Sequence, residues 1–349
     1  MAGRQRVELI AREVIAVAAG AASPHSGPTV GWWMTPGKAG LDTQARGLAQ
    51  ATGLAFEHRV VRPRPPWSWF PGHLTPGVLH SLAAHSDPIE PPWPEVLITC
   101  GRRAVPVALA VRKASRGRTM LVHVQDPRVP VRLFDLVIPM QHDALRGPNV
   151  YPVTGALHDL TPERLAAAAT RFQAEFADLP RPLVAVLVGG SNTSYQLGPG
   201  EVRSLTALLH ATAAEHHAGF VVTTSRRTGR ANAQLIENQL ADLPARVWTG
   251  RGENPYRAML ALADHIIVTS DSVSMVSEAA STGKPLHVFD LPGGGGRFGR
   301  FHAALRERGI TRPYTGSLET WHYPALDDTA RTARLVLEHR AARAVATHG

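Results

Sequence analysis

Cysteine and lysine are nearly absent from this sequence. Its single cysteine, Cys100, excludes a disulfide framework and fits a reducing compartment. Only three of the 37 basic residues are lysine, and the other 34 are arginine. The sequence contains no run of about 18 uncharged apolar residues, so it predicts no transmembrane helix.

Aromatic residues are also few, at 6%, and no block of basic residues is interleaved with them. Nucleic acid is therefore not the expected partner. The net charge of +9 still favours an anionic one, such as a nucleotide, a phosphate or an acidic membrane surface. The 44% hydrophobic and 19% charged content is typical of a globular protein, and 349 residues suffice for two domains.

Apolar runs alternate with helical patterns along the chain, which predicts parallel sheets with crossover helices. In the first half we expect strands at 29–35, 95–100, 119–125 and 136–140, and helices at 41–52, 76–85 and 104–115. In the second half we expect strands at 183–190, 219–225, 245–250, 265–270 and 286–290, and helices at 200–217, 230–241, 255–263 and 273–282.

The repeated alternation indicates an α/β chain with two Rossmann-like domains, mainly parallel sheets and a cleft between them. The expected divisions are an N-terminal helix or extension at 1–28, a first domain at 29–158, a linking helix at 159–180, a second domain at 181–325 and a C-terminal helix at 326–349. The linking helix begins with a Thr-Pro-Glu pattern, which favours a capped helix start.

Polar loops follow the strands of the second half, where parallel strands expose their carboxyl ends to ligands. Glycines, hydroxyls, arginines and a helix N-terminus there suit phosphate oxygens. The predicted binding residues are Gly189, Gly190, Ser191, Asn192, Thr193, Ser225, Arg226, Arg227, Glu253, Asn254, Ser270, Asp271, Ser272, Ser274 and Glu278. The alternative is local structure: a tight glycine turn, an exposed basic loop, helix caps at Asn254 and Ser272, and a solvated Glu278.

The first half offers candidates for catalysis. Lys38 lies in a glycine-containing turn that suits an anion, and Asp126 and His142 follow strands and are candidate general bases. His142 could equally cap or pack. No His, Cys and Asp spacing suggests a bound metal.

Several segments together resemble the bacterial branch of the mitochondrial fission ELM (elongated mitochondria) family. They include TPGKAGLDTQARGLA, QDPRVPVRLFDLVIPMQHD, GGSNTSY, TTSRRT, GENPYRAMLALAD and VTSDSVSMVSEAASTGKP. The last is also similar to the nucleotide-sugar segment of GT-B glycosyltransferases. The resemblance implies a GT-B fold, no obligatory metal, a nucleotide diphosphate held by the second domain, and a ribose bonded by Glu278.

The resulting expectation is a glycosyltransferase-like protein, without a cofactor, that binds a nucleotide-diphosphate sugar, UDP-linked, as substrate. It would transfer the sugar to an envelope or lipid-linked acceptor by metal-independent inversion. The alternative is a non-catalytic recruitment protein, as described for the plant relatives. An epimerase is less favoured, because Ser272-Val273-Ser274 replaces the double glycine of those enzymes.

The expected location is cytoplasmic, or peripheral at the inner membrane. The segment 62–77 holds Trp67, Trp69 and Phe70 beside arginines, which would suit an anionic membrane surface or a lipid-linked acceptor. Burial of these aromatic side chains within the domain is the alternative.

Overall fold

The first half of the chain forms a five-stranded parallel sheet with the order β2-β1-β3-β4-β5. A computed structural model describes residues 30–65, 67 and 75–348; the expected extension at 1–28 lies outside this part. The strands are β1 (Gly31–Thr35), β2 (Phe56–Val60), β3 (Val96–Cys100), β4 (Met120–Val124) and β5 (Leu136–Ile138). The sequence did not predict β2, whose polar residues suit its position at the sheet edge.

The second half forms a six-stranded sheet with the order β11-β10-β9-β6-β7-β8, again parallel throughout. Its strands are β6 (Leu183–Val188), β7 (Gly219–Thr224), β8 (Ala245–Trp248), β9 (His265–Thr269), β10 (Leu286–Phe289) and β11 (Thr311–Pro313). The prediction missed β11, a three-residue edge strand. The α/β fold class with two mainly parallel sheets is confirmed.

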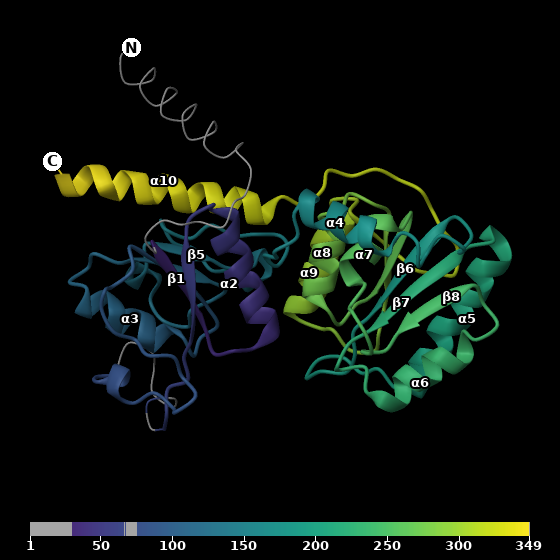
Figure 1. The fold of residues 1–349 in the computed structure, drawn as a ribbon, viewed down its shortest axis with the longest axis horizontal. Coiled ribbons are helices and arrows are strands. Elements are labelled where there is room, and N and C mark those ends of the chain that lie inside the picture. The colour runs from purple at the N-terminus through teal and green to yellow at the C-terminus, as the bar shows by residue number, and fades with distance from the viewer. Residues whose placement is uncertain (1–29, 66, 68–74, 349) are drawn as a thin grey trace, which may run out of the picture.

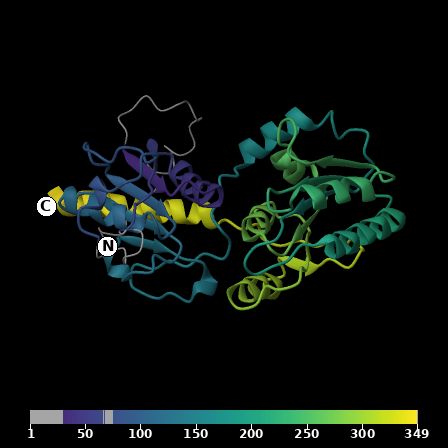
Figure 2. The same ribbon diagram turned by 90° about the horizontal axis from the view of Figure 1, so that it is seen from below.

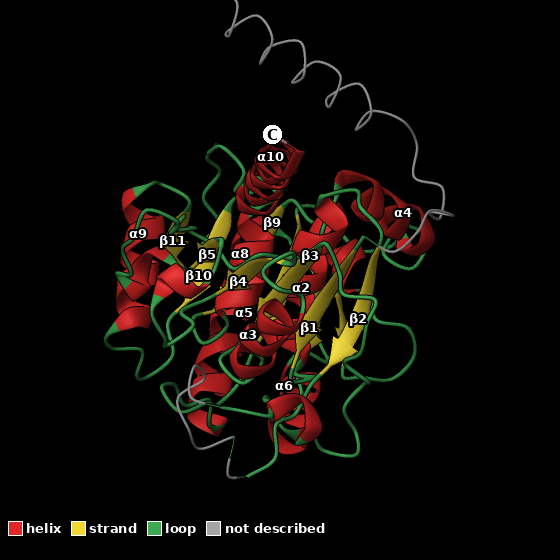
Figure 3. Cartoon of the chain, turned by 90° about the vertical axis from the view of Figure 1, so that its left-hand side faces the viewer, coloured by secondary structure: helices red, strands yellow, loops and turns green. Residues whose placement is uncertain are grey.

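Helices flank the strands of both sheets (Figure 3). They are α2 (Ala39–Ala51), α3 (Val105–Ala114), α4 (Pro162–Phe172), α5 (Pro199–His216), α6 (Arg230–Gln239), α7 (Tyr256–Leu262), α8 (Val273–Ala280), α9 (Arg297–Glu307) and α10 (Asp328–His348), with 3-10 turns at Val78–His80, Val131–Leu133 and Gln141–Asp143. Because helices cover both faces, the central strands β3, β4, β6 and β9 are buried along their whole length.

Two helical predictions differ from the structure, and one helix was not predicted. The segment 76–85 forms only the turn Val78–His80, and the linking helix expected at 159–180 spans only Pro162–Phe172. The sequence analysis did not predict α9, which directly follows a run of four glycines. Glycine has a low helix propensity, so this helix start gives no sequence signal.

The chain forms two lobes, and α10 returns from the second to lie along the first (Figures 1 and 2). It packs against α2. Arg340 pairs with Glu95 at 2.8 Å, and Arg343 pairs with Asp135 at 2.6 Å. The end of the chain thus stabilises the first sheet.

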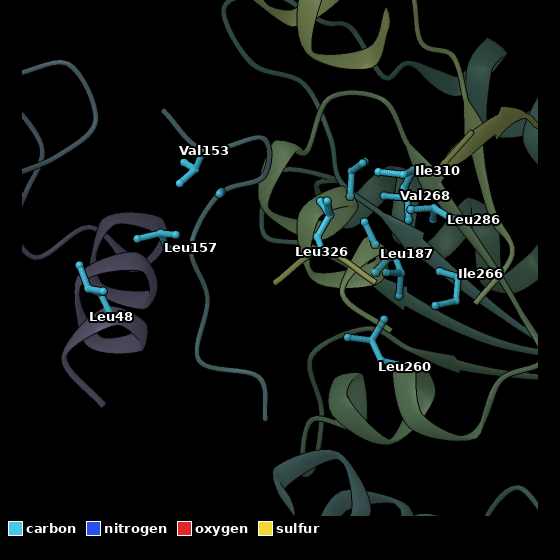
Figure 4. Close-up of a cluster of buried hydrophobic side chains, with 14 of the residues drawn as sticks. Leu48, Val153, Leu157, Leu187, Leu260, Ile266, Val268, Leu286, Ile310 and Leu326 are labelled. Carbon is cyan, nitrogen blue, oxygen red and sulfur yellow. The ribbon is translucent and has the colours of Figure 1, made fainter. Parts of the chain in front are cut away.

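Buried apolar side chains also connect the lobes. One continuous cluster contains Leu48 of α2, Val153 and Leu157 from the connecting segment, and Leu187 and Leu260 of the second lobe (Figure 4). Burial of such a cluster favours a defined arrangement of the lobes, since separating them would expose its apolar surface to water.

Asp328, at the start of α10, provides a test of this arrangement. Its buried carboxylate accepts hydrogen bonds from the backbone amides of Thr154 and Gly155, at 3.0 and 2.7 Å. We expect Asp328→Ala to lower the free energy of unfolding by ~2–4 kcal/mol, because both amides lose their partner. Urea denaturation measures the change.

The neighbouring Asp327 is the matched control, since its exposed carboxylate pairs with exposed Arg334 at 3.2 Å. Asp327→Ala should cost less than ~1 kcal/mol. Equal losses in the two variants would contradict the role assigned to Asp328.

Candidate functional site

Three of the polar loops predicted from the sequence, those after β6, β7 and β9, meet at the carboxyl edge of the second sheet, and Asp271 is their common partner. Its Oδ2 atom accepts a 2.8 Å hydrogen bond from the Gly190 backbone amide and lies 2.8 Å from Arg227 Nη1. Its Oδ1 atom accepts a 2.7 Å hydrogen bond from the Thr269 hydroxyl. Because this side chain is fully buried, Asp271 holds the loops after β6, β7 and β9 together.

Gly189 and Gly190 allow these loops to pack closely. A Cβ atom on Gly189 would lie 2.2 Å from Asp271 Oδ2, and one on Gly190 would lie 2.1 Å from the carbonyl carbon of Arg227. The sequence interpretation was that the glycines admit a ligand to the backbone. The close approach of two chain segments already accounts for both positions.

Most hydroxyl and amide groups in these loops bond to the chain itself. Ser225 Oγ donates to a backbone carbonyl oxygen at 2.6 Å, while Ser191 Oγ and Ser270 Oγ each accept from a backbone amide at 2.9 Å. Asn192 Oδ1 accepts from two backbone amides, at 2.7 and 3.0 Å. These side chains therefore fix the conformation of the loops at the sheet edge. The groups that were predicted to bind a ligand instead form hydrogen bonds with the backbone.

The N-terminus of α8 lies at the same edge. Ser272 is the helix cap, and its Oγ accepts from the backbone amide three residues later at 3.5 Å. Ser274 is half-buried in the first turn, and Thr193 and Arg226 are exposed in the neighbouring loops. The positive end of the helix dipole and these hydroxyls are suited to phosphate oxygens.

A pocket of about 310 Å³ lies between the lobes, where α2, the connecting segment, α7 and α8 meet. Of the predicted binding residues, it contains Asn254 and Glu278. Its lining residues are Thr43, Arg46, Asp159, Leu160, Asn254, Tyr256, Arg257 and Glu278.

Glu278 is the acidic group on the second-lobe wall of this pocket. Its carboxylate accepts a hydrogen bond from the Tyr256 hydroxyl. Burial raises the pKa of Glu278 to about 7, although the Tyr256 bond acts in the opposite direction. The charge of Asp159 raises this pKa further, and that of Arg257 lowers it. Glu278 is therefore not the solvated helix residue of the alternative interpretation.

Asp159 connects the two lobes at the same pocket. One of its carboxylate oxygens lies 2.9 Å from Arg46 of α2, 3.1 Å from Arg164 of α4 and 2.9 Å from Arg257 of α7. The Asp159 side chain is only 7% exposed. Three guanidinium groups from separate helices thus share one buried anion.

The catalytic candidates of the first lobe lie outside the set of residues that lines this pocket. Lys38 is exposed at the start of α2. Asp126 pairs with Arg128 at 3.0 Å. His142 packs edge-on against Phe301 of α9, with ring centroids 5.9 Å apart, and burial lowers its pKa. This position agrees with the packing alternative for His142.

The two predicted binding residues in the loop after β8 have different surroundings. Glu253 pairs with Arg171 of α4 at 2.5 Å, and both side chains are exposed. Asn254 Oδ1 accepts a 3.0 Å hydrogen bond from the backbone amide of Tyr256, and Asn254 also lines the pocket. Local capping thus explains much of this loop.

Sequence reasoning missed Arg46, Asp159, Tyr256 and Arg257 as pocket residues. Tyr256 and Arg257 directly follow a loop that was already singled out, so their position was a usable signal. Arg46 and Asp159 carried none, because they reach the pocket from a helix of the other lobe and from the connecting segment.

Metal and membrane predictions concern other parts of the molecule. Within 30–65, 67 and 75–348, no group of three or more His, Cys, Asp or Glu residues could hold a metal ion, and no helix has the length and hydropathy to cross a membrane. Trp67 packs against the first-lobe core, and its Nε1 donates to the Pro76 carbonyl oxygen at 2.7 Å. Trp69 and Phe70 lie outside the described residues.

Sequence comparison shows extended similarity to one family. The family model described as "Mitochondrial fission ELM1" matches residues 39–340. Mitochondrial fission protein ELM1 of Arabidopsis thaliana is 35% identical over 279 residues, which cover 72% of this chain and 65% of that protein. The chain therefore spans about two thirds of this relative. The uncharacterized protein RP120 of Rickettsia prowazekii (strain Madrid E) is 26% identical over 87% of this chain and 97% of its own.

Solved structures with the same fold are GT-B proteins. UDP-GlcNAc 2-epimerase from Methanocaldococcus jannaschii has a TM-score of 0.55 at 9% identity, covering 88% of this chain and 99% of the epimerase. UGT71G1 from Medicago truncatula, complexed with UDP-glucose, has a TM-score of 0.50 at 12% identity, covering 90% of this chain and 93% of its own. At these identities the similarity shows the fold alone.

Replacement of Asp271 tests its assigned structural role. Asp271→Ala leaves the buried Gly190 amide and Arg227 without their acceptor, so we expect a loss of ~3–5 kcal/mol in the free energy of unfolding, measured with urea. Asp290 is the control, because its exposed carboxylate pairs with exposed Arg306 at 2.7 Å. Asp290→Ala should cost less than ~1 kcal/mol. A cost equally small for Asp271→Ala would refute this role.

The pKa of Glu278 predicts a pH dependence of stability. Its value of about 7 exceeds the ordinary 4.5, so the folded chain holds this proton more tightly than the unfolded chain. The resulting stabilisation is present below pH 4.5 and is lost as the pH rises to about 7. Between pH 5 and 8 wild type should lose ~1–3 kcal/mol relative to Glu278→Gln, which stays neutral.

Urea denaturation of both proteins at the two pH values measures this difference. Glu338→Gln, a change at an exposed position of α10, should retain the pH dependence of the wild type. If Glu278→Gln retains it as well, the buried carboxylate is not its cause.

Proposed function

The chain belongs to the mitochondrial fission ELM1 family and has a GT-B fold, and on this basis we propose that its second lobe binds the nucleotide of a nucleotide-diphosphate sugar. The observation that carries the proposal is Glu278, a half-buried carboxylate of α8 that lines the pocket. A carboxylate can accept hydrogen bonds from two ribose hydroxyls, and the helix N-terminus favours the diphosphate.

In the proposed arrangement the ribose occupies the pocket at Glu278, where its hydroxyls take the place of the Tyr256 hydroxyl. The diphosphate lies toward Ser272 and Ser274, and the base lies toward Asn254. Two structures of this fold support a uridine nucleotide. M. jannaschii UDP-GlcNAc 2-epimerase, at a TM-score of 0.51, was solved with UDP-GlcNAc and UDP, and UGT71G1 with UDP-glucose.

Sugar transfer would add a chemical step to this binding. A base would take the proton of an acceptor hydroxyl, whose oxygen bonds the anomeric carbon as the bond to the diphosphate breaks. Asp126 is tied to Arg128, and the pKa of His142 is lowered by burial against Phe301. These contacts favour the second candidate function, a protein that binds a nucleotide sugar without transferring it. The Arabidopsis relative, named a mitochondrial fission protein, is consistent with such a role.

Calorimetric titration of the full chain with UDP and UDP-GlcNAc tests the nucleotide site. We expect binding, with affinity at least ~10-fold weaker in Glu278→Gln, because the neutral amide is a poorer acceptor for two hydroxyls. Glu338→Gln should bind as wild type does. Unchanged affinity in Glu278→Gln, or no binding by wild type, would exclude the proposed site.

A further inference from the structure

The charges at the pocket wall do not balance. Arg46, Arg164 and Arg257 all lie within 3.1 Å of one Asp159 oxygen, so three positive charges share one negative charge. By contrast, Asp271 pairs with the single guanidinium of Arg227. Glu278 adds less than a full negative charge near neutral pH, since burial raises its pKa to about 7. Arg164 contacts Asp159 from outside the pocket lining, and the lining itself carries Arg46 and Arg257 against Asp159 and a partly protonated Glu278. Together these groups retain an excess of positive charge.

Two of these arginines have donors left for a ligand. Arg46 and Arg257 line the pocket, and each contacts Asp159 through one Nη2 atom. A guanidinium carries five N–H donors. The Nε atom of Arg46 has no hydrogen-bond partner among the described residues, but it is buried, so a ligand would contact the exposed part of the guanidinium instead. The side chains of Arg46 and Arg257 are still 40% and 42% exposed, so a ligand can reach them.

The geometry points to a site for a phosphoryl group between Arg46 and Arg257. Both guanidiniums contact the same carboxylate oxygen, which places them within reach of one small anion. Guanidinium forks match the oxygen spacing of phosphate, and the low dielectric of a pocket strengthens such bonds. The Thr43 hydroxyl and the Asn254 amide line the same pocket and can donate as well.

The bound anion also connects the lobes. Arg46 belongs to α2 of the first lobe, and Arg257 belongs to α7 of the second. A phosphoryl group that binds both arginines would stabilise the contact between these helices, as Asp159 already does. This site does not require nucleotide-sugar binding. If the phosphoryl group belongs to the nucleotide, its diphosphate lies toward Arg46 and Arg257 instead of Ser272 and Ser274. Otherwise the group belongs to a separate phosphate ester.

Titration of the full chain with inorganic phosphate tests the site. We expect saturable binding that weakens at least ~10-fold in Arg46→Gln and in Arg257→Gln, each of which removes a charged fork. Arg46→Lys keeps a charge for Asp159 but loses the fork, so it should also bind more weakly while it remains folded. The control is Arg334→Gln, which changes an exposed arginine of α10 and should leave phosphate affinity unchanged.

A second titration, at saturating UDP, identifies the source of the phosphoryl group. If phosphate no longer binds, the site is the one that holds a phosphoryl group of the nucleotide. If phosphate still binds, the site takes a second molecule. Both outcomes are compatible with the proposed phosphoryl site, provided that binding depends on the two arginines. Equal phosphate affinity in wild type and Arg46→Gln, or no phosphate binding at all, overturns the inference. Arginine-dependent phosphate binding without UDP-GlcNAc binding would refute the proposed function alone.

Discussion

The buried carboxylate of Asp271 is the interaction on which the edge of the second sheet depends. Parallel strands bring their carboxyl ends together, but backbone amides and a guanidinium at that edge need an acceptor once they are removed from water. Asp271 supplies it to Gly190 and Arg227. This close packing requires the two glycines at the start of the loop after β6, because a side chain at either position would collide with the neighbouring chain segments.

A second buried carboxylate, Asp159, has the corresponding role between the lobes. It lies in the segment that connects them and binds arginines of α2, α4 and α7. The apolar cluster that includes Leu48 and Leu187 reinforces the same arrangement. The pocket consequently combines residues from both halves of the chain, and the charge on its wall depends on how closely the lobes approach.

Much of the fold was predictable because buried parallel strands have a simple signature. Strand β6 is a continuous apolar run and β9 has an apolar centre, since helices cover both of their faces. Strand β2, with the sequence FEHRV, lies at an edge and has three consecutive polar residues at its centre, so the same rule missed it. In the site, the position of Asp271 at the sheet edge and that of Glu278 in the following helix could be predicted, but their hydrogen-bond partners could not.

The sequence by itself determined the alternating α/β pattern, the family resemblance and the polar loops at the strand ends, because these depend on neighbours along the chain. Only the tertiary structure decided which polar groups are already paired. It turned Asp271 inward to the loops and placed Tyr256 against Glu278. It also brought Arg46 to Arg257 across more than 200 residues of chain. Such pairings depend on how two lobes pack, and local sequence spacing carries no information about that contact.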